Sequence, residues 1–395
     1  MFDLEKVQSA LHEAGLDGWL LYDFRGSNPL ARRILDLGDR KPGSRRFFYF
    51  IPARGTPVKV VHAIESAALD HLPGTKRVFS RWQELEAAVG EQVAGRSRIA
   101  MEYSPRNANP YIGRVDAGTI EMVRSFGPEI VSSGDLIQEF EATWDDDQWR
   151  MLLRAAEVTD SAFDVAFGLI RKAVRDGRKT SESEVQRAIL DHFAAHGLVT
   201  YSPPNVSVGP HSGDPHYEMT AETDAPIGPG DFVLIDLWAK VDDPKGVYSD
   251  LTRVGYVGET VPEKYEQVFD VVARARDAAI AAVRDAFAAG RPIRGGEVDD
   301  AARSVIEAAG LGKFYTHRTG HNIGREVHGN GAHLDNLETR DDRLILRRTG
   351  FSIEPGVYYP DDFGIRSEVN LFVDAGGQVH VTGGEPQERV LAILA

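Results

Sequence analysis

Cysteine is absent from this chain of 395 residues. Disulfide bonds, thiolate ligation of metals and a cysteine nucleophile are therefore all excluded. The absence also fits a reducing compartment, where structural disulfides are rare. We expect the protein to be cytoplasmic.

Long apolar runs and an excess of positive charge are missing as well. No stretch approaches the ~18 apolar residues that a membrane-spanning helix needs. The opening MFDLEKVQSALHEAG lacks the basic and apolar regions of a signal peptide. Lys and Arg number 45 against 60 Asp and Glu, which gives a formal net charge of −15. Because nucleic-acid binding usually requires a basic surface, we expect neither nucleic acid nor a membrane as a partner.

The length of the chain predicts two domains, because a single hydrophobic core rarely grows beyond ~300 residues. Helical and strand patterns alternate in the first third. Apolar strand candidates lie at 19–24, 47–51, 58–63 and 98–103. Such alternation is typical of an α/β domain. We expect an α/β domain over residues 1–143 and a second domain of helices and strands over residues 144–395.

Capping residues mark the helices that open the second domain. Asp145, followed by two further aspartates, offers an N-cap and negative charge at a helix start. Ser181 and Glu184 form the S-x-x-E pattern of a capping box, and Gly197 suits the end of that helix. Two further helices are expected at 262–289 and 297–309.

Residues 28–46 combine six Lys and Arg with several Gly and Pro, which predicts a loop. Two roles stay open for it. The loop is either a solvated surface segment or one that reaches the active site of a partner subunit.

Four carboxylates and one imidazole in the second half of the chain carry most of the chemistry. They occur in LIDLWAK, YSDLTR, HRTGHNIG, SIEPGVY and GIRSEVN, as Asp236, Asp250, His321, Glu354 and Glu368. An oxygen-rich set without thiolate suits hard or borderline divalent cations. If the five converge, two metal ions could share carboxylates and activate water for amide hydrolysis. Each residue alone has an ordinary structural explanation.

Asp236 and Asp250 together favour a metal site more than either does alone. Side chains alternate along a strand, so Asp236 shares a face with Leu234 and Trp238. Asp250 follows 14 residues later, beyond a turn at 242–246, on what should be the adjoining strand of a hairpin. A lone carboxylate in a run as apolar as FVLIDLW is costly to bury, and two on paired strands repel without a cation between them. The pair therefore favours a metal site over a structural role.

Three histidines, His317, His321 and His328, lie within 12 residues in THRTGHNIGREVHGNG. The interspersed glycines disfavour a regular helix, so we expect a glycine-rich loop or an irregular strand. A single histidine would more often be structural. Three together favour a functional cluster.

The order of these five candidates resembles that of the metal-dependent peptidases of the pita-bread fold, of the creatinase, prolidase and aminopeptidase P type. The family's ligand order is Asp, Asp, His, Glu, Glu. The separations of 14, 71, 33 and 14 residues are similar to the family's, apart from a slightly longer first gap. The resemblance implies a creatinase-like α/β domain at 1–143, a pita-bread catalytic domain at 144–395, and a homodimer.

The resemblance also implies how the ligands divide between two divalent metal ions. Asp236 would chelate one ion, His321 and Glu354 would bind the other, and Asp250 and Glu368 would bridge both. A hydroxide shared by the metals would attack the scissile carbonyl. Mn²⁺ is the family's usual metal, and Zn²⁺ or Co²⁺ suit the same ligands.

Further roles follow from position in the family's motifs. With Glu354, which would steer the nucleophile's proton, His328 would act in catalysis by stabilising the oxyanion. His216, in DPHYEMT, would act beside them on the proline side of the substrate. The substrate-binding group would be His317, Arg340 and Arg366, with Arg366 also supporting the ligand carboxylates.

The activity that the resemblance implies is hydrolysis of the Xaa-Pro bond. The imide nitrogen of that bond has no N–H, so peptidases that bind the backbone through hydrogen bonds handle it badly. We favour a dipeptidase, in which Arg340 would read the free carboxylate after proline. A solvated Arg340 stays equally open. The alternatives are an aminopeptidase P acting on longer peptides and a non-catalytic peptide-binding module.

Two positions depart from the family pattern. Pro204, in YSPPNVSVG, stands where members often carry a tyrosine that supports a ligand carboxylate, and Tyr201 is the candidate to replace it. Trp238 stands where members often have a small residue. It either narrows the site or packs in the core.

Overall fold

The computed structural model describes residues 2–38 and 41–395. It divides into two compact units, Met1–Glu141 and Ala142–Ala395. The domain boundary expected from the sequence, between residues 143 and 144, lies two residues further along the chain. No helix in the described part is long and apolar enough to cross a membrane.

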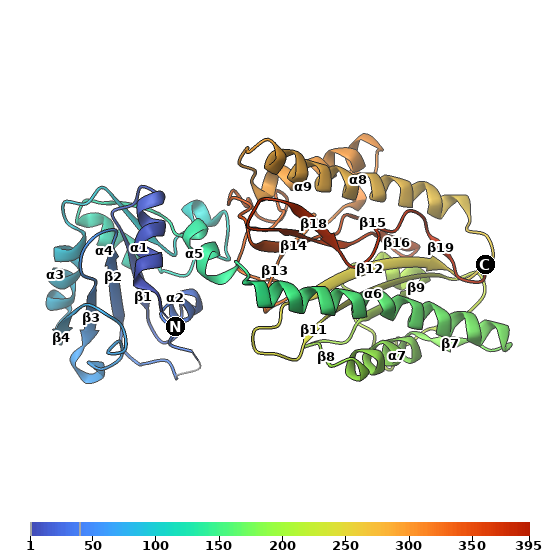
Figure 1. Cartoon of the computed structure of the whole chain (residues 1–395), viewed down its shortest axis with the longest axis horizontal. Helices are drawn as coiled ribbons and strands as arrows, with labels where there is room; N and C mark the ends of the chain where they lie inside the picture. The colour runs from blue at the N-terminus through green and yellow to red at the C-terminus, as the bar shows by residue number, and fades with distance from the viewer. Residues whose placement is uncertain (1, 39–40) are drawn as a thin grey trace. The chain divides into compact units, whose positions relative to one another are not determined.

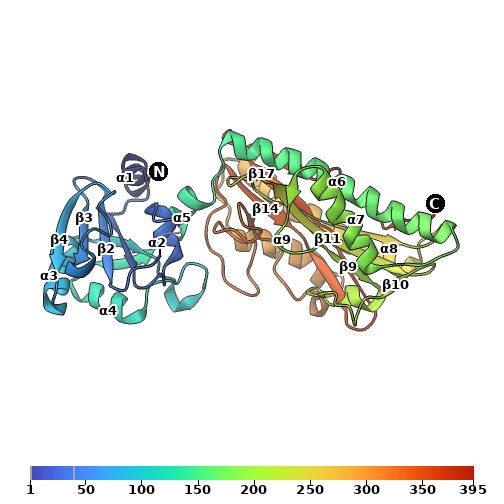
Figure 2. The same cartoon turned by 90° about the horizontal axis from the view of Figure 1, so that it is seen from below.

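The first unit is a six-stranded mixed sheet with helices on both faces (Figure 1, Figure 2). The strand order is β4-β3-β2-β1-β5-β6. Helices α1, α2 and α5 pack on one face, and α3 and α4 on the other. The elements are β1 (Gly18–Asp23), β2 (Phe47–Pro52), β3 (Val58–His62), β4 (Thr75–Phe79), β5 (Arg98–Met101), β6 (Glu129–Ser132), α1 (Leu4–Glu13), α2 (Pro29–Ile34), α3 (Trp82–Val93), α4 (Ala117–Ser125) and α5 (Gly134–Glu141).

The four strands predicted for this unit are confirmed as β1, β2, β3 and β5, whereas β4 and β6 were not predicted. The first four residues of β4 are exposed and only Phe79 is buried, so this strand carries no apolar alternation. The predicted loop at 28–46 is wrong in part, because its start folds into α2. Asn28 caps this helix by accepting a hydrogen bond from the backbone N–H of Ala31, and Pro29 occupies the first turn. Residues 39–40 of that loop lie outside the described residues.

In the second unit, the sheets lie between two pairs of helices. Helices α8 (Glu263–Ala288) and α9 (Gly295–Ala308) cover one side, and α6 (Asp146–Arg175) and α7 (Glu182–Ala195) the other (Figure 1). One sheet runs β19-β12-β11-β8 with β9 also paired to β11, a second runs β13-β14-β17-β18, and β15–β16 and β7–β10 form separate pairs. The strands are β7 (Thr180–Ser181), β8 (Leu198–Val199), β9 (Asn205–Val208), β10 (Pro226–Ile227), β11 (Phe232–Val241), β12 (Ser249–Tyr256), β13 (Asn322–Ile323), β14 (Thr349–Ile353), β15 (Gly356–Tyr359), β16 (Phe363–Arg366), β17 (Val369–Val373), β18 (Val379–Thr382) and β19 (Leu391–Ala392).

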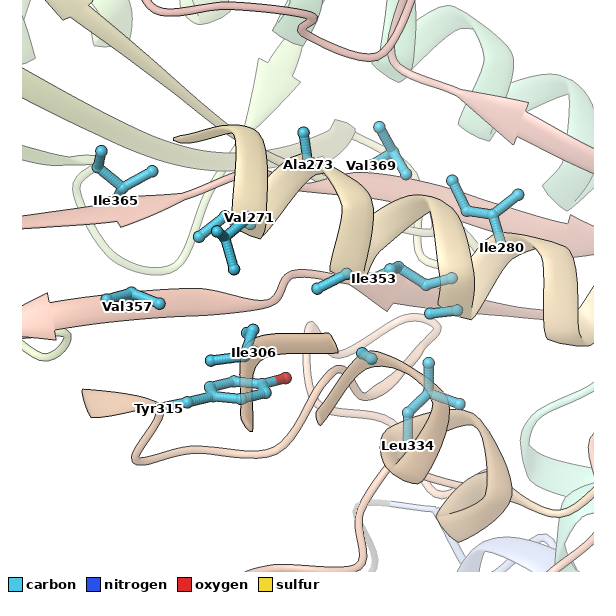
Figure 3. Packing of buried hydrophobic residues seen from close by; sticks show 14 of the residues in the cluster. Val271, Ala273, Ile280, Ile306, Tyr315, Leu334, Ile353, Val357, Ile365 and Val369 are labelled. Atoms are coloured by element: carbon cyan, nitrogen blue, oxygen red, sulfur yellow. The ribbon is translucent and has the colours of Figure 1, made fainter. Parts of the chain in front are cut away.

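Apolar side chains from α8 and α9 pack against β14, β15, β16 and β17 (Figure 3). Val271 and Ile280 of α8 and Ile306 of α9 belong to the same buried cluster as Ile353 of β14 and Val369 of β17. Fully burying one such side chain contributes roughly 1.5–3 kcal/mol. This core therefore holds β14 and β17 in place. Glu354 directly follows β14, and Glu368 directly precedes β17.

The two N-caps are confirmed, but the reciprocal half of the capping box at Ser181 is not formed, because the Glu184 side chain accepts from Thr180 and Arg178 instead. Asp145 accepts a hydrogen bond from the N–H of Gln148, whose side chain returns to the N–H of Asp145, and together they begin α6. Ser181 caps α7 by accepting from the N–H of Glu184. Gly197 follows that helix with φ 72°, a conformation that favours glycine. Helix α9 begins at residue 295, two residues earlier than predicted.

The strand segments that carry the candidate ligands are interrupted. The apolar segment FSIEPGVYY divides at Glu354 and Pro355 into β14 and β15. Proline has no N–H for a ladder, so the break is encoded in the sequence. Glu368 lies in a similar break between β16 and β17. The predicted hairpin of β11 and β12 is confirmed, with Asp236 opposite Thr252 and Asp250 opposite Trp238.

Candidate metal centre

Three of the candidate ligands form a compact buried group. Asp250, His321 and Glu368 each offer one ligand atom, and these atoms lie within 4.8 Å of one another. His321 Nε2 is 3.4 Å from Asp250 Oδ2 and 3.3 Å from Glu354 Oε1. Glu354 therefore adjoins the same group. The contributing segments are β12, the residue before β13, and the breaks after β14 and β16.

Asp236 joins the group from the neighbouring strand. On one face of an antiparallel pair, diagonal positions are within reach of each other, and Asp250 is diagonal to Asp236 because it pairs with Trp238. Thr252 Oγ1 lies 3.1 Å from Asp236 Oδ1 and 2.7 Å from Glu368 Oε2. The structure thus brings all five predicted ligands together.

Burial and mutual repulsion raise the pKa of three of these carboxylates. Desolvation, followed by the charges of Asp236 and Glu354, raises the pKa of Asp250 well above its usual value. Desolvation and the charge of Asp250 do the same to the pKa of Glu368. The pKa of Glu354 rises to about 7, mainly by desolvation and against the opposing charge of Arg366. Only a cation or protons can relieve this concentration of charge.

Two observations show that the residues fit a divalent cation. Glu368 Oε1 is buried and has no hydrogen-bond partner among the described residues, an arrangement that is costly unless an ion completes it. Desolvation, with the charges of His328 and Arg318, lowers the pKa of His321 well below its usual value. The ring is therefore neutral, which is the form that ligates metals.

Hydrogen bonds behind the ligands hold their orientation. The N–H of His321 donates to Ser352 Oγ at 3.0 Å, and Ser352 Oγ in turn donates to Glu354 Oε1 at 3.2 Å. The N–H of Asp250 donates to Asn370 Oδ1 at 3.1 Å. His321 Nδ1 lies 3.3 Å from its neighbour's backbone carbonyl, which leaves Nε2 directed at the carboxylates. Such supporting contacts fix ligand geometry in metal sites.

Arg366 links the ligands to the histidine group. It is ion-paired with Asp236, and it donates to Thr252 Oγ1 and to the Tyr358 hydroxyl, both at 3.0 Å. The Tyr358 hydroxyl lies 2.9 Å from His317 Nε2, and His317 Nδ1 lies 2.7 Å from the Arg318 carbonyl. Because that carbonyl can only accept, Nδ1 carries the proton and Nε2 accepts from Tyr358. Both nitrogens of His317 are therefore engaged, and only its ring surface is left to line a pocket.

The remaining histidines stay close to this group. The rings of His328 and His321 lie 4.3 Å apart, edge to face. Desolvation and the charge of Arg318 lower the pKa of His328 to about 4, and burial lowers that of His317 to about 3. His216 is exposed, and its charge contributes to both of these lowered pKa values. Histidines 216, 317 and 328 therefore lie near one another.

Neither Arg340, the candidate for carboxylate binding, nor the nearby Arg343 joins the ligands. Arg340 is exposed and has no ion pair with any described residue. Arg343 is buried, but it is ion-paired with Asp341 and donates to the Asn330 carbonyl at 2.9 Å. These contacts join Arg343 to the loop at Asn330 and Asp341.

Arg318 is the cation that sequence reasoning missed. It is 8% exposed. Its charge lowers the pKa of Glu354, His321 and His328. Its position next to His317, in a motif already singled out for its histidines, was the signal that could have identified it. Ser352, Thr252 and Tyr358 were also missed, because nothing local in the sequence marks a supporting hydroxyl.

Tyr201, the candidate to replace the family's tyrosine, meets Trp238 beside the aspartates. The Tyr201 ring lies 6.1 Å from the Trp238 ring, and its pKa is raised by desolvation and by the charges of Asp250 and Asp236. No hydrogen bond joins Tyr201 to either aspartate among the described residues. Trp238 packs at the margin of a small aromatic core, so it both borders the ligands and contributes to packing.

A buried group of four carboxylates and one neutral imidazole on this fold defines a metal-dependent hydrolase. The model of metallopeptidase family M24 matches residues 150–375, more than half of the chain, and the chain belongs to this family. All five candidate ligands lie within the matched residues.

Two of the sequence relatives are described as dipeptidases. The chain is 32% identical over 257 residues to "Putative dipeptidase YkvY" of Bacillus subtilis, covering 65% of this chain and 64% of that protein. It is 30% identical over 217 residues to an Xaa-Pro dipeptidase of Lactobacillus delbrueckii subsp. lactis, covering 55% of this chain and 53% of that protein. The aligned part thus spans less than two thirds of either relative.

Solved structures share the fold over nearly the whole chain. Dipeptidase PepE from Mycobacterium ulcerans superposes with a TM-score of 0.67 at 23% identity, covering 99% of this chain and 96% of that one. The Xaa-Pro dipeptidase from Bacillus anthracis gives a TM-score of 0.59 at 22% identity, covering 98% of each chain. The predicted fold class, an N-terminal α/β domain before a pita-bread domain, is confirmed.

The charge balance of the centre predicts how pH acts on the metal-free protein. A carboxyl group whose pKa is raised by folding binds more protons in the folded than in the unfolded state, so its contribution to stability is lost as pH rises. The pKa of Glu354 is about 7, and those of Asp250 and Glu368 are also raised. The buried histidines are neutral in both states above pH ~7.5 and do not oppose this effect. Melting temperatures of metal-free protein should fall as pH rises through 7, and less so with Mn²⁺. An equal fall in melting temperature with and without Mn²⁺ would contradict the assignment of these carboxylates as metal ligands.

Glu368→Gln separates the effect of charge repulsion on stability from the effect of metal ligation. Without metal, the variant should unfold at a higher temperature than the wild type, by an amount equivalent to ~1–3 kcal/mol, because a buried, repelled carboxylate is removed. With Mn²⁺, it should gain less stability than the wild type, because a ligand is lost. Thermal unfolding with and without metal measures both, and exposed Glu388→Gln is the control. A metal-free variant less stable than the wild type would refute the repulsion argument.

Proposed function

We propose that this protein is an Xaa-Pro dipeptidase that cleaves the peptide bond before a C-terminal proline with the help of two divalent metal ions. The observation that carries the proposal is the buried group of Asp250, His321 and Glu368, with Glu354 and Asp236 adjoining it. The names of several relatives supply the substrate class. Because their sequence alignments cover only part of those proteins, the substrate belongs to the proposal.

The five ligands would hold the metals in the division that the family order implies. Asp236 would chelate one ion, His321 and Glu354 the other, and Asp250 and Glu368 would be shared. Two divalent ions bound there would lower the pKa of water enough to supply a nucleophile at neutral pH and would polarise the scissile carbonyl. Mn²⁺ is the metal we favour, since oxygen ligands predominate.

Proton movement would fall to Glu354. Its Oε1 lies 3.3 Å from His321 Nε2, so the carboxylate adjoins the place where the metal-activated water would stand and can accept a proton there. Ser352 donates to its Oε1 and so orients the group. Glu354 would take a proton from the attacking water and deliver it towards the leaving imide nitrogen, which has none of its own.

His328 would stabilise the oxyanion. With a pKa of about 4 it is neutral at pH 7 and keeps one N–H to donate. Loss of one such donor typically costs roughly 100- to 1000-fold in rate. His216 and the ring of His317 would contact the proline, with His317 held by Tyr358 and Arg366.

The carboxylate after proline needs a cation, and Arg318 suits this role better than Arg340. Arg318 is buried beside Glu354 and two histidines, where a charge interaction is strong. Arg340 is exposed and screened by solvent. We therefore assign to Arg318 the binding of the substrate carboxylate that was first expected of Arg340.

The fold does not separate the dipeptidase from an aminopeptidase P. An X-Pro aminopeptidase from Thermotoga maritima superposes with a TM-score of 0.56 at 21% identity. Cleavage of longer Xaa-Pro peptides is therefore the second candidate, and the buried Arg318 favours the first. Residues 144–395 would form the catalytic domain, and we propose a cytoplasmic homodimer.

A length series tests the substrate assignment. The Mn²⁺-loaded protein should hydrolyse Ala-Pro with a higher kcat/KM than Ala-Pro-Ala-Ala, because a free carboxylate pairs with the buried cation. Ala-Ala is the control for the need for proline. A preference for the tetrapeptide would favour the aminopeptidase, and no cleavage of any peptide would favour a binding module.

Matched arginine variants test which cation reads the carboxylate. Arg318→Gln should raise KM for Ala-Pro by roughly 10- to 100-fold, as expected for loss of a charge-assisted contact worth ~1.5–3 kcal/mol. It should change KM for the amide Ala-Pro-NH₂ much less, and Arg340→Gln should leave both near wild type. If Arg340→Gln raised KM and Arg318→Gln did not, the role would return to Arg340.

A further inference from the structure

A buried carboxylate outside the metal centre, that of Glu182, is surrounded by hydrogen-bond donors. Glu182 is the first residue of α7 and has no exposed surface. Among the described residues no Lys or Arg pairs with it. Instead Oε1 accepts from the N–H of Val208 at 2.8 Å and from His211 Nδ1 at 2.8 Å. Oε2 accepts from the Tyr217 hydroxyl at 2.9 Å and from the N–H of Ala225 at 3.1 Å.

These four donors all lie in residues 208–225, which comprise the last residue of β9 and the connection to β10 and are called loop 208–225 below. The donors lie at its beginning, its middle and its end, so the whole loop converges on one side chain. A carboxylate offers about four acceptor positions, and all four are used here. The backbone N–H of Glu182 also donates to the Ala225 carbonyl at 3.1 Å. The loop is therefore fastened to the first turn of α7.

His216 lies in the part of this loop where two side chains, those of His211 and Tyr217, donate to Glu182. It lies between His211 and Tyr217, whose rings stack with centroids 4.2 Å apart. Its own N–H donates to Asp214 Oδ1 at 2.9 Å, and the N–H of Tyr217 donates to the Asp214 carbonyl at 3.2 Å. The residues on both sides of His216 are thus fixed, while its side chain is exposed and within range of a charge interaction with His317 and His328.

The loop has a second attachment on the hairpin that carries Tyr358 and Arg366. The N–H of Gly364 in β16 donates to Ser212 Oγ at 2.9 Å. A Cβ atom on Gly213 would collide with the carbonyl of Tyr359 in β15, so the backbones approach closely there. Glu182 on one side and this hairpin on the other leave the loop little freedom.

We propose that Glu182 is a positioning residue for the peptidase reaction, which fastens loop 208–225 so that His216 stands beside His317 and His328. The inference rests on the proposed function, because His216 matters to turnover only if a substrate binds there. The side chain of Glu182 is hydrogen-bonded to loop 208–225 and, among the described residues, to none of the metal ligands. Its removal should therefore act through His216 and leave metal binding intact.

A double-mutant cycle tests this coupling in the Mn²⁺-loaded protein with Ala-Pro as substrate. Glu182→Gln keeps the shape of the side chain but turns an amide N–H₂ towards donors. It should lower kcat/KM by roughly 10- to 100-fold, the effect expected when a supporting contact is lost. His216→Ala should lower it as well, and the double variant should be no worse than His216→Ala alone. Fully additive losses would overturn the proposal, as would a wild-type kcat/KM for Glu182→Gln.

Glu184→Gln is the matched control. Glu184 lies in the same turn of α7, but it is exposed and accepts from Thr180 and Arg178 outside the loop. This variant should keep wild-type kcat/KM, and the metal content of all variants should equal that of the wild type. If Glu182→Gln does not fold, Tyr217→Phe removes one donor to the same carboxylate. It should show a smaller loss that is also non-additive with His216→Ala, and an additive or absent loss would overturn the proposal.

Amide hydrogen exchange separates this inference from the proposed function. Exchange in residues 208–225 should be faster in Glu182→Gln than in the wild type and unchanged in Glu184→Gln. If the wild type cleaves no Xaa-Pro peptide, the proposed function fails, and faster exchange would still show that Glu182 fastens the loop. Unchanged exchange in Glu182→Gln would refute the fastening itself.

Discussion

Repulsion between buried carboxylates is the constraint on which the second unit depends. Asp250 and Glu368 are desolvated within reach of the charges of Asp236 and Glu354. Arg366 pairs with Asp236, yet Glu368 Oε1 keeps no hydrogen-bond partner among the described residues. Folding places these groups together because the apolar cores on both sides of the sheets outweigh the local cost. Divalent cations would turn that cost into binding energy.

The surroundings of the ligands follow from the same constraint. Breaks between strands leave Glu354 and Glu368 free of the backbone ladder, and the hairpin of β11 and β12 sets two aspartates diagonally on one face. Burial keeps the histidines neutral, so that they can ligate a metal or donate a hydrogen bond rather than add positive charge. Loop 208–225, fastened by Glu182, completes the histidine group. The ligands are thus rigidly supported, as metal sites require.

The sequence was most informative where chemistry and local pattern coincide. The ligand order, the hairpin, the caps at Asp145 and Ser181 and the fold class were all predictable, because each depends on residues close in sequence or on a family's spacing. The charged edge strand β4 and the short helix α2 were not, although Asn28 and Pro29 form a recognisable helix start. Supporting groups such as Arg318 and Glu182 were missed, because their partners are distant in sequence and only the tertiary structure brings them together. Arg340 is the converse case, in which position in a motif suggested a role that its exposure does not favour.

The central claim is that these five residues together hold two divalent cations. Diffraction from Mn²⁺-soaked crystals at the manganese absorption edge tests it most directly, since anomalous peaks locate the ions without reference to activity. We predict two peaks per chain, both within ligand distance of Asp250 and Glu368, with His321 beside one of them. Peaks elsewhere on the chain, with Asp250 and Glu368 unligated, would contradict the account.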